Sequence, residues 1–164
     1  MFLDHYVMTT PEAIKSLLGN DIFLSAIFSL VIAQIVKMVV YLLTSKHKKM
    51  RVAIVTAIWR TGGMPSSHSA IVCSLATTTA MSDGIDSNIF VFSLIFAMVV
   101  LRDALGVRRA AGMQARALNN LGKQTAEKTG IEFRTIKEIQ GHTPLEVTVG
   151  ALLGIFIAIG FYLI

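Results

Sequence analysis

The chain has 164 residues, of which 54% are hydrophobic and 15% charged, and its formal net charge at pH 7 is +5. A mean hydropathy of +0.65 excludes an ordinary water-soluble domain and indicates a protein that buries much of itself in lipid. Cys73 is the single cysteine, which excludes an intramolecular disulfide and a metal cluster held by several thiolates.

In chain order, the sequence predicts a short amphipathic helix over 10–18 and then four membrane-crossing helices over 22–43, 65–81, 88–105 and 144–164. The first of these is long enough to cross a bilayer at about 1.5 Å of rise per residue. A helical insertion over 102–141 separates the last two crossings. The expected fold is therefore an all-α, polytopic helical membrane bundle that forms one domain over 1–164.

Charge placement predicts the orientation of this bundle. The loop after the first crossing, 44–51, is basic and so is the insertion, whereas the turn at 82–87 carries only acidic charges. Basic loops stay in the cytoplasm. We therefore expect an integral protein of the cell membrane with both termini outside. The basic residues lack interleaved aromatic side chains, so we do not expect nucleic acid as a partner.

The segment from Gly62 to Ala70, Gly-Gly-Met-Pro-Ser-Ser-His-Ser-Ala, is the first candidate site. Glycines such as Gly63 permit a backbone nest for anions, and Ser66 or Ser67 would cap the helix that follows. A helix N-terminus favours negative charge, so a phosphate could rest here beside His68. The alternative is a capped helix start whose histidine is incidental.

The second candidate site pairs His142 with Glu146, four residues later. On a helix these side chains share one face, so the carboxylate could fix the imidazole tautomer and make it more basic. The stretch from Thr143 to Glu146 also matches a capping box, in which the glutamate would bond to backbone N–H groups instead. Spacing alone leaves both readings open.

Several cations are expected on the membrane side where His68 and His142 lie. Lys37 sits inside the first crossing, where a lysine is either functional or reaches the nearby interface. Arg102, Arg109, Arg116 and Lys123 recur every seven residues and form one basic stripe, which suits either phosphate or lipid headgroups. Arg108 and Arg109 are closest to the membrane and are the better candidates for phosphate binding.

Three motifs stand out together: the Gly62–Ala70 segment, Asp103-Ala-Leu-Gly-Val-Arg-Arg-Ala-Ala-Gly-Met-Gln-Ala and Gly141-His-Thr-Pro-Leu-Glu-Val-Thr-Val-Gly. In this order they resemble the divergent branch of the type 2 phosphatidic acid phosphatase superfamily, which is related to acid phosphatases and vanadium-dependent haloperoxidases. The resemblance implies a phosphatase of packed helices that needs neither metal nor cofactor. It makes His142 the nucleophile, with Glu146 in place of the usual aspartate, and His68 the general acid. A phosphohistidine would form and then be hydrolysed.

The chain departs from the superfamily pattern in its phosphate clamp. The lysine that precedes Arg-Pro by seven residues has no match, and Thr135 and Ile136 stand where Ser-Arg would precede the nucleophile. Cations from elsewhere would have to surround the phosphate oxygens. The candidate cations are Lys37, Arg60, Arg108, Arg109 and Arg134. Gly63, Ser66 and Ser67 complete the set of candidate phosphate-binding residues.

The sequence thus predicts a membrane phosphatase that hydrolyses a lipid-linked or other amphiphilic phosphomonoester at the cytoplasmic face. Its expected partners are a lipid phosphate or phosphate anion and the membrane lipids. The alternatives are a non-catalytic phospholipid-headgroup binder or transporter, and a structural membrane subunit. A homo-oligomer is one way in which so small a bundle would complete its core.

Overall fold

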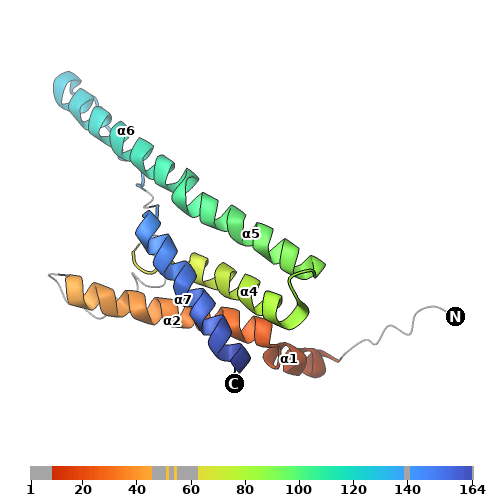
Figure 1. Cartoon of the computed structure of the whole chain (residues 1–164). Helices are drawn as coiled ribbons and strands as arrows, with labels where there is room; N and C mark the ends of the chain where they lie inside the picture. The colour runs from red at the N-terminus through yellow and green to blue at the C-terminus, as the bar shows by residue number, and fades with distance from the viewer. Residues whose placement is uncertain (1–8, 46–50, 52–53, 55–62, 139–140, 164) are drawn as a thin grey trace.

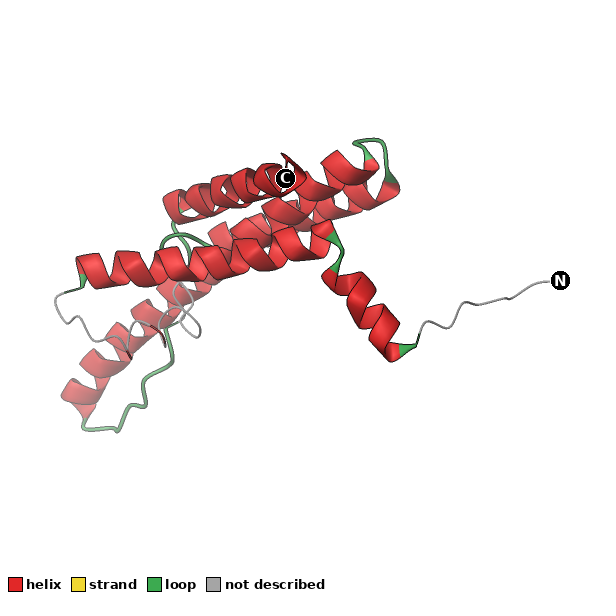
Figure 2. Ribbon diagram, turned by 90° about the horizontal axis from the view of Figure 1, so that it is seen from below, coloured by secondary structure: helices red, strands yellow, loops and turns green. Residues whose placement is uncertain are grey.

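The computed structural model describes residues 9–45, 51, 54, 63–138 and 141–163, and its helices are all α-helical (Figure 1). They are α1 (Thr10–Leu18), α2 (Asp21–Thr44), α4 (Ser67–Asp83), α5 (Asn88–Leu105), α6 (Val107–Thr129) and α7 (Pro144–Leu163). No β-strand occurs in these described ranges (Figure 2). The all-α prediction is confirmed. The helices lie close to the expected ranges, whereas their assignment to one membrane domain stays a prediction.

Local side-chain caps explain where these helices begin. The side chains of Asn20, Ser66 and Ser87 accept hydrogen bonds from the backbone N–H groups of Phe23, Ser69 and Phe90, three residues on. Each cap satisfies a donor in the first turn that has no partner within the helix. Such caps are worth about 1 kcal/mol each and fix the register of the helices that follow.

Helix α4 occupies the centre of the bundle, where it packs against α2, α5 and α7 (Figure 1). Its buried positions carry small residues, among them Ser69, Ala70, Ser74 and Thr78. Lipid offers little hydrophobic drive for association between helices, so close approach through small side chains supplies the packing. This composition gives α4 its central position.

Helices α2 and α4 run antiparallel, and one hydrogen bond between them marks their register. The hydroxyls of Ser25 and Thr78 lie 2.7 Å apart, and both side chains are buried. One and two helical turns further along α2, Ser29 and Ala33 are also fully buried. Lys37 follows after one more turn, at the end of the bundle where α4 begins.

The glycines of α7 let it approach α4 more closely than any other residue would. A Cβ atom at Gly150 would overlap the backbone of Ser66, and one at Gly154 would overlap the carbonyl of Ala70. The Gly-xxx-Gly pair therefore serves helix packing. It also presses the start of α7 against the start of α4, where the two histidine motifs lie.

We expect Gly154→Ala to lower the stability of the bundle by about 1–3 kcal/mol, because the added methyl group meets rigid backbone rather than a flexible side chain. Thermal unfolding in detergent measures this change. The matched control is Gly160→Ala, since a Cβ there meets nothing within 4 Å. Equal melting temperatures for the two variants would contradict the packing role.

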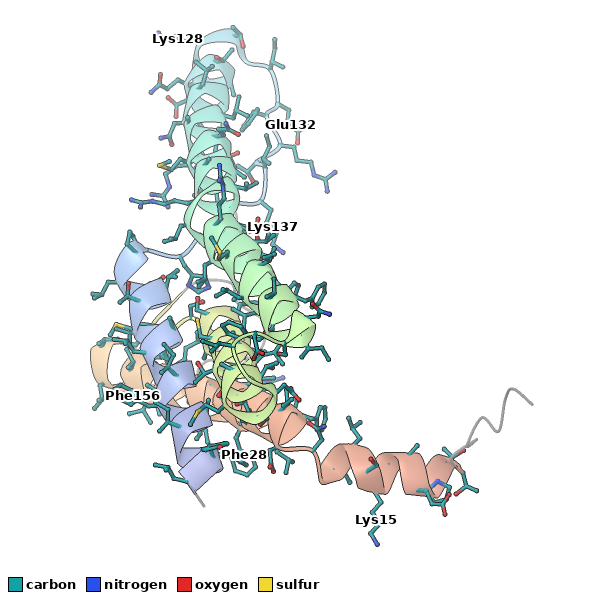
Figure 3. The ribbon with its side chains drawn as sticks, turned by 45° about the vertical axis from the view of Figure 1, so that its right-hand side comes forward. Lys15, Phe28, Lys128, Glu132, Lys137 and Phe156 are labelled. Atoms are coloured by element: carbon teal, nitrogen blue, oxygen red, sulfur yellow. The ribbon has the colours of Figure 1, made fainter. Side chains whose placement is uncertain are left out.

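Three of the described helices are long and apolar enough to cross a membrane: α2, the α5–α6 segment and α7. Their large apolar side chains point outward, as Phe156 does on α7 (Figure 3). Helix α4, expected as the second crossing, has 17 residues and carries many serines and threonines. It is shielded by its neighbours, so its own residues need not be apolar. That α4 crosses the full bilayer stays a prediction.

The expected insertion is a helical arm with an extended return. Helix α6 follows α5 after a break at Gly106 and adds roughly 35 Å at 1.5 Å per residue. The return segment, 130–138, runs back along α6 (Figure 3). The buried amide of Asn119 donates to the Ile136 carbonyl at 2.8 Å and accepts from the Ile136 N–H at 2.8 Å.

A second set of contacts closes the arm, where Arg116 pairs with Glu138 at 3.2 Å and Phe133 lies over Gly122. The return segment therefore delivers the chain back to the bundle just before His142.

Candidate active site

The first half of the site is the loop that leads into α4. Gly63 has a φ of +89°, which strongly favours glycine, and the Met64–Pro65 peptide bond is cis. Ser66 Oγ accepts hydrogen bonds from the N–H and the hydroxyl of Ser69, at 3.3 and 2.9 Å. Ser66 and Ser67 are buried, whereas His68 is exposed. The capped helix start is confirmed, and its first turn places the His68 imidazole at an accessible position.

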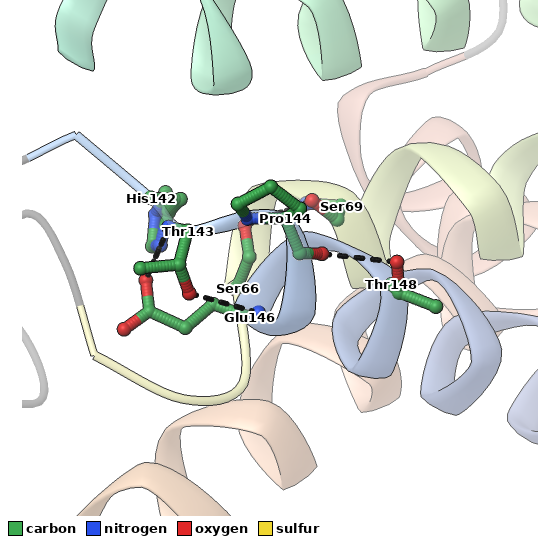
Figure 4. Close-up of polar contacts among 7 residues, drawn as sticks. All are labelled: Ser66, Ser69, His142, Thr143, Pro144, Glu146 and Thr148. Atoms are coloured by element: carbon green, nitrogen blue, oxygen red, sulfur yellow. Dashed lines mark hydrogen bonds and ion pairs between the residues drawn. The ribbon is translucent and has the colours of Figure 1, made fainter.

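The second half of the site is the start of α7. His142 Nδ1 lies 3.1 Å from Glu146 Oε2, and the same carboxylate oxygen accepts the Thr143 N–H at 3.0 Å (Figure 4). The Glu146 N–H in turn donates to Thr143 Oγ1 at 3.3 Å. Glu146 therefore both closes the capping box and contacts the imidazole. With Nδ1–H donating to the carboxylate, Nε2 is the ring nitrogen with a free lone pair.

A backbone hydrogen bond joins the two halves. The Ser66 N–H donates to the Glu146 carbonyl at 3.0 Å, directly beside the close contact of Gly150 with Ser66. Both histidine motifs are anchored on this contact. Motion of the start of α4 relative to the start of α7 would therefore break a buried hydrogen bond. The two histidine motifs, distant in sequence, thus form one rigid unit at one end of the bundle.

The environment of His142 favours its neutral form. The side chain is buried, and this burial lowers its pKa below the ordinary value, while the hydrogen bond and charge of Glu146 act in the opposite direction. The positive charges of Lys37 and Arg108 lower the pKa further. A neutral imidazole that is anchored through Nδ1 has the protonation state that a nucleophile or general base requires.

We expect His142 to titrate below pH 6.5, so that Nε2 stays unprotonated through the neutral range and gains a proton only in acid. Replacing Glu146 with glutamine removes the interaction that raises the pKa, so the midpoint should move to still lower pH. NMR titration of histidine-labelled protein, with His142→Ala to assign the signal, measures both midpoints. A midpoint above pH 6.5 would contradict the described environment.

Two of the candidate cations lie near both histidines. Lys37 and Arg108 each interact electrostatically with His68 and with His142. The Lys37 side chain is 5% exposed and runs alongside Gly63, where an added Cβ would lie 3.6 Å from Lys37 Cε. Lys37 has no hydrogen bond or ion pair with any described residue. Among the described residues, Glu146 is the acidic residue whose charge acts on Lys37.

The other candidates contribute differently. Arg109 is exposed, and its backbone lies against Gly141, so it positions the His142 loop. Arg134 is exposed on the return segment, away from the interactions described for the two histidines. Arg60 lies outside the described residues. Of the four candidate cations that the structure describes, Lys37 and Arg108 are therefore the two that act on both histidines.

Asp103 is a site residue to which the sequence analysis gave no role. Its Oδ2 lies 2.6 Å from Arg108 Nε, and its charge also acts on His68. A spacing of five residues does not pair side chains on a continuous helix. The break in the helix at Gly106 makes this ion pair possible. In the sequence, the signal for the pair was a glycine between an acidic residue and an arginine. The pair holds Arg108 toward the site.

The candidate site gathers positive charge and two imidazoles at one end of the bundle. It combines two cations, a neutral buried imidazole, an exposed imidazole and the N-terminal turn of α4. Within the described residues no group of three His, Cys, Asp or Glu side chains could hold a metal ion.

A sequence profile described as the divergent PAP2 family matches residues 18–157 of this chain. The chain belongs to the divergent PAP2 family. It is also similar to the uncharacterized membrane protein YuiD of Bacillus subtilis, with 38% identity over 156 residues that cover 87% of this chain and 94% of the relative. No solved structure matches the chain. The resemblance drawn from the three motifs is confirmed, and so is membership among membrane proteins.

The match to the divergent PAP2 family spans α2, α4, α5, α6 and most of α7. All the described site residues fall inside it, from Lys37 to Glu146. The superfamily's Lys and Ser-Arg motifs are missing from a chain that nonetheless belongs to the divergent branch. Lys37 and Arg108 are the described cations whose charges act on both histidines.

Proposed function

We propose that this protein is a membrane phosphatase that hydrolyses a lipid-linked or amphiphilic phosphomonoester through a phosphohistidine on His142. The observation that carries the proposal is the buried, neutral His142, oriented by Glu146 through Nδ1 and flanked by Lys37 and Arg108. Membership in the divergent PAP2 family supports the reaction class.

The proposed first step transfers the phosphoryl group to the protein. The lone pair of His142 Nε2 attacks phosphorus while the bond from phosphorus to the substrate oxygen breaks. Protonated His68 gives its proton to the departing alkoxide, which leaves as an alcohol. Lys37 and Arg108 stabilise the negative charge on the phosphoryl oxygens as it redistributes. Glu146 stabilises the positive charge that forms on the imidazole ring.

The second step regenerates the enzyme. Neutral His68 removes a proton from a water molecule as the water oxygen attacks phosphorus, and the bond from phosphorus to Nε2 breaks. Inorganic phosphate leaves, and the His142 lone pair is restored.

We further propose that the site faces the cytoplasm of the cell membrane. The basic loop at 44–51 and the basic arm lie at the ends of the helices that carry the site, and positive loops are retained inside. Cysteine labelling from outside at Ser82→Cys, on the opposite end of α4, tests this orientation. Labelling only from the cytoplasmic side would overturn it.

The leaving group gives the sharpest test of the roles. Detergent-purified protein with a chelator would be offered an alkyl phosphate and an aryl phosphate, whose leaving group needs little protonation. His68→Ala should slow release from the alkyl phosphate far more than from the aryl phosphate, whereas His142→Ala should slow both. Equal effects of His68→Ala on the two substrates would contradict its role as general acid.

A second candidate function is phospholipid-headgroup binding without turnover. Arg108 is already engaged by Asp103, which leaves Lys37 as the cation without a described ion-pair partner. A site of this kind would retain vanadate but release no phosphate. Vanadate binding measured beside phosphate release therefore separates the two functions.

A further inference from the structure

Helix α6 presents three different faces along the arm. The return segment, 130–138, covers the first face, on which Asn119 is buried. The basic stripe, with Arg116 and Lys123, forms the second face and is exposed. The third face is also exposed but is largely apolar. Among the described helices α6 packs against α5 alone, so this third face has no partner within the described part of the chain.

The residues of this third face follow a 3.5-residue repeat. Leu118 is 52% exposed and Leu121 is 62% exposed, and they belong to a series of exposed positions that are alternately four and three residues apart. This series, the α6 seam, consists of Val107, Ala111, Gln114, Leu118, Leu121 and Thr125. Two helices that pack along their length in a coiled coil use this spacing. The seam therefore predicts a second helix beside α6.

Lipid does not account for the leucines of the seam. Helix α5 is long enough to cross the membrane, and α6 continues in its direction, away from the other helices (Figure 1). At 1.5 Å per residue, Leu118 lies roughly 17 Å and Leu121 roughly 21 Å beyond Val107, where α6 begins. The headgroup layer adds only about 5–8 Å on each side of the hydrocarbon core. With α5 across the bilayer, both leucines lie in water, where an exposed apolar strip marks a protein-binding surface.

The distribution of charge around α6 fits a second copy of this chain. Copies in one membrane carry their arms on the same side and at the same depth, so a two-fold axis along the membrane normal places two seams beside each other in register. The basic stripe, at Arg109, Arg116 and Lys123, lies roughly 160–200° around the helix from the seam, at about 100° per residue. Two seams can therefore meet without bringing the basic stripes together.

The polar residue in the middle of the seam also fits a self-contact. Gln114 would meet Gln114 of the second copy at the two-fold axis, and an amide can both donate to and accept from an identical amide. A single polar residue in an apolar seam fixes the register and the number of helices. A charged residue at this position would instead have opposed the pairing of two copies.

We propose that two copies of this chain associate through the α6 seam, as a parallel dimer whose arms pack along each other outside the bilayer. The dimer does not depend on the proposed phosphatase reaction. It bears on the candidate site all the same, because α6 carries Arg108 in its first turn and the return segment leads to His142. Contact between two arms would restrain both.

Cysteine crosslinking in membranes tests this arrangement. A Cys73→Ala background removes the single native thiol. In that background, mild oxidation should link Gln114→Cys into a disulfide-bonded dimer. The matched control, Lys123→Cys, is exposed on the opposite face of the same helix and should stay monomeric. Equal crosslinking at the two positions, or none at Gln114→Cys, would overturn the proposal.

A charged seam tests the same contact without a crosslink. Leu121→Glu would place like charges opposite each other in the dimer, whereas Asn120→Glu adds the same charge at an exposed position outside the seam. Single-molecule photobleaching in liposomes counts the copies. The unaltered protein and Asn120→Glu should be dimers and Leu121→Glu a monomer, with equal helix content by circular dichroism.

Three results would contradict the dimer in this second experiment. Leu121→Glu that remains dimeric would show that another surface joins the copies. An unaltered protein that is monomeric would remove the self-contact, whether its seam is then covered by lipid or by a different protein. Loss of the dimer in Asn120→Glu as well would assign the effect to charge rather than to the seam.

Discussion

Replacing His142 with alanine is expected to reduce phosphate release by roughly three orders of magnitude or more, because it removes the atom that bonds to phosphorus. The side chain is buried and oriented by Glu146, whereas the other described histidine, His68, is exposed on another helix. Initial rates of phosphate release from a long-chain alkyl phosphate, with vanadate binding as a parallel readout, measure the effect.

Two further variants make the His142 result specific. Thr148→Val alters an exposed residue of the same helix end, whose hydroxyl donates to the Pro144 carbonyl, and should leave the rate unchanged. Glu146→Gln keeps an oxygen that can accept from both the Thr143 N–H and Nδ1–H, but it removes the negative charge that would stabilise the imidazole as it becomes positive, so the rate should fall. A native rate in Glu146→Gln would contradict the electrostatic role of Glu146.

Replacing Lys37 with methionine is expected to lower the rate of phosphate release by roughly 10²–10³-fold, in the range seen when one preorganised donor is removed from a transition state. Methionine keeps the apolar stem that runs along Gly63 and removes the ammonium group. Since Lys37 has no bonded partner among the described residues, its removal should not reduce stability and should also weaken vanadate binding.

The matched control is Lys15→Met on the exposed helix α1, far from the site (Figure 3). It changes the net charge of the protein by the same amount. If both variants lowered the rate equally, the effect would come from overall charge. If Lys37→Met unfolded the protein while vanadate binding per folded molecule stayed native, the lysine would have a structural role instead.

The sequence predicted the helices well because their signals are local. Pro11 at the start of α1 and Ser66 at the start of α4 mark helix beginnings that depend on a few neighbouring residues. Length and apolarity likewise predicted that α2 and α7 are able to cross a membrane, and both helices have that length and apolarity in the structure. The three motifs identified the family, and they singled out His68 and His142 as candidate site residues.

The remaining features depend on contacts between distant segments. The burial of Lys37 follows from the α2–α4 register, which the Ser25–Thr78 hydrogen bond fixes and no local pattern encodes. The two contacts of Glu146 could not be predicted without the position of the imidazole relative to the first turn of α7. Asp103 reaches Arg108 because the helix breaks at Gly106. Helical periodicity in the sequence does not predict this change of direction.

The most direct test of the central claim is to trap the phosphorylated protein. Purified protein would be mixed with a long-chain alkyl phosphate, quenched in alkali within the first turnover, digested and mapped by mass spectrometry. The proposed mechanism predicts a phosphoryl group on His142 that disappears on longer incubation and is absent in His142→Ala. Phosphate release without any phosphorylated His142, or with the label on another residue, would contradict it.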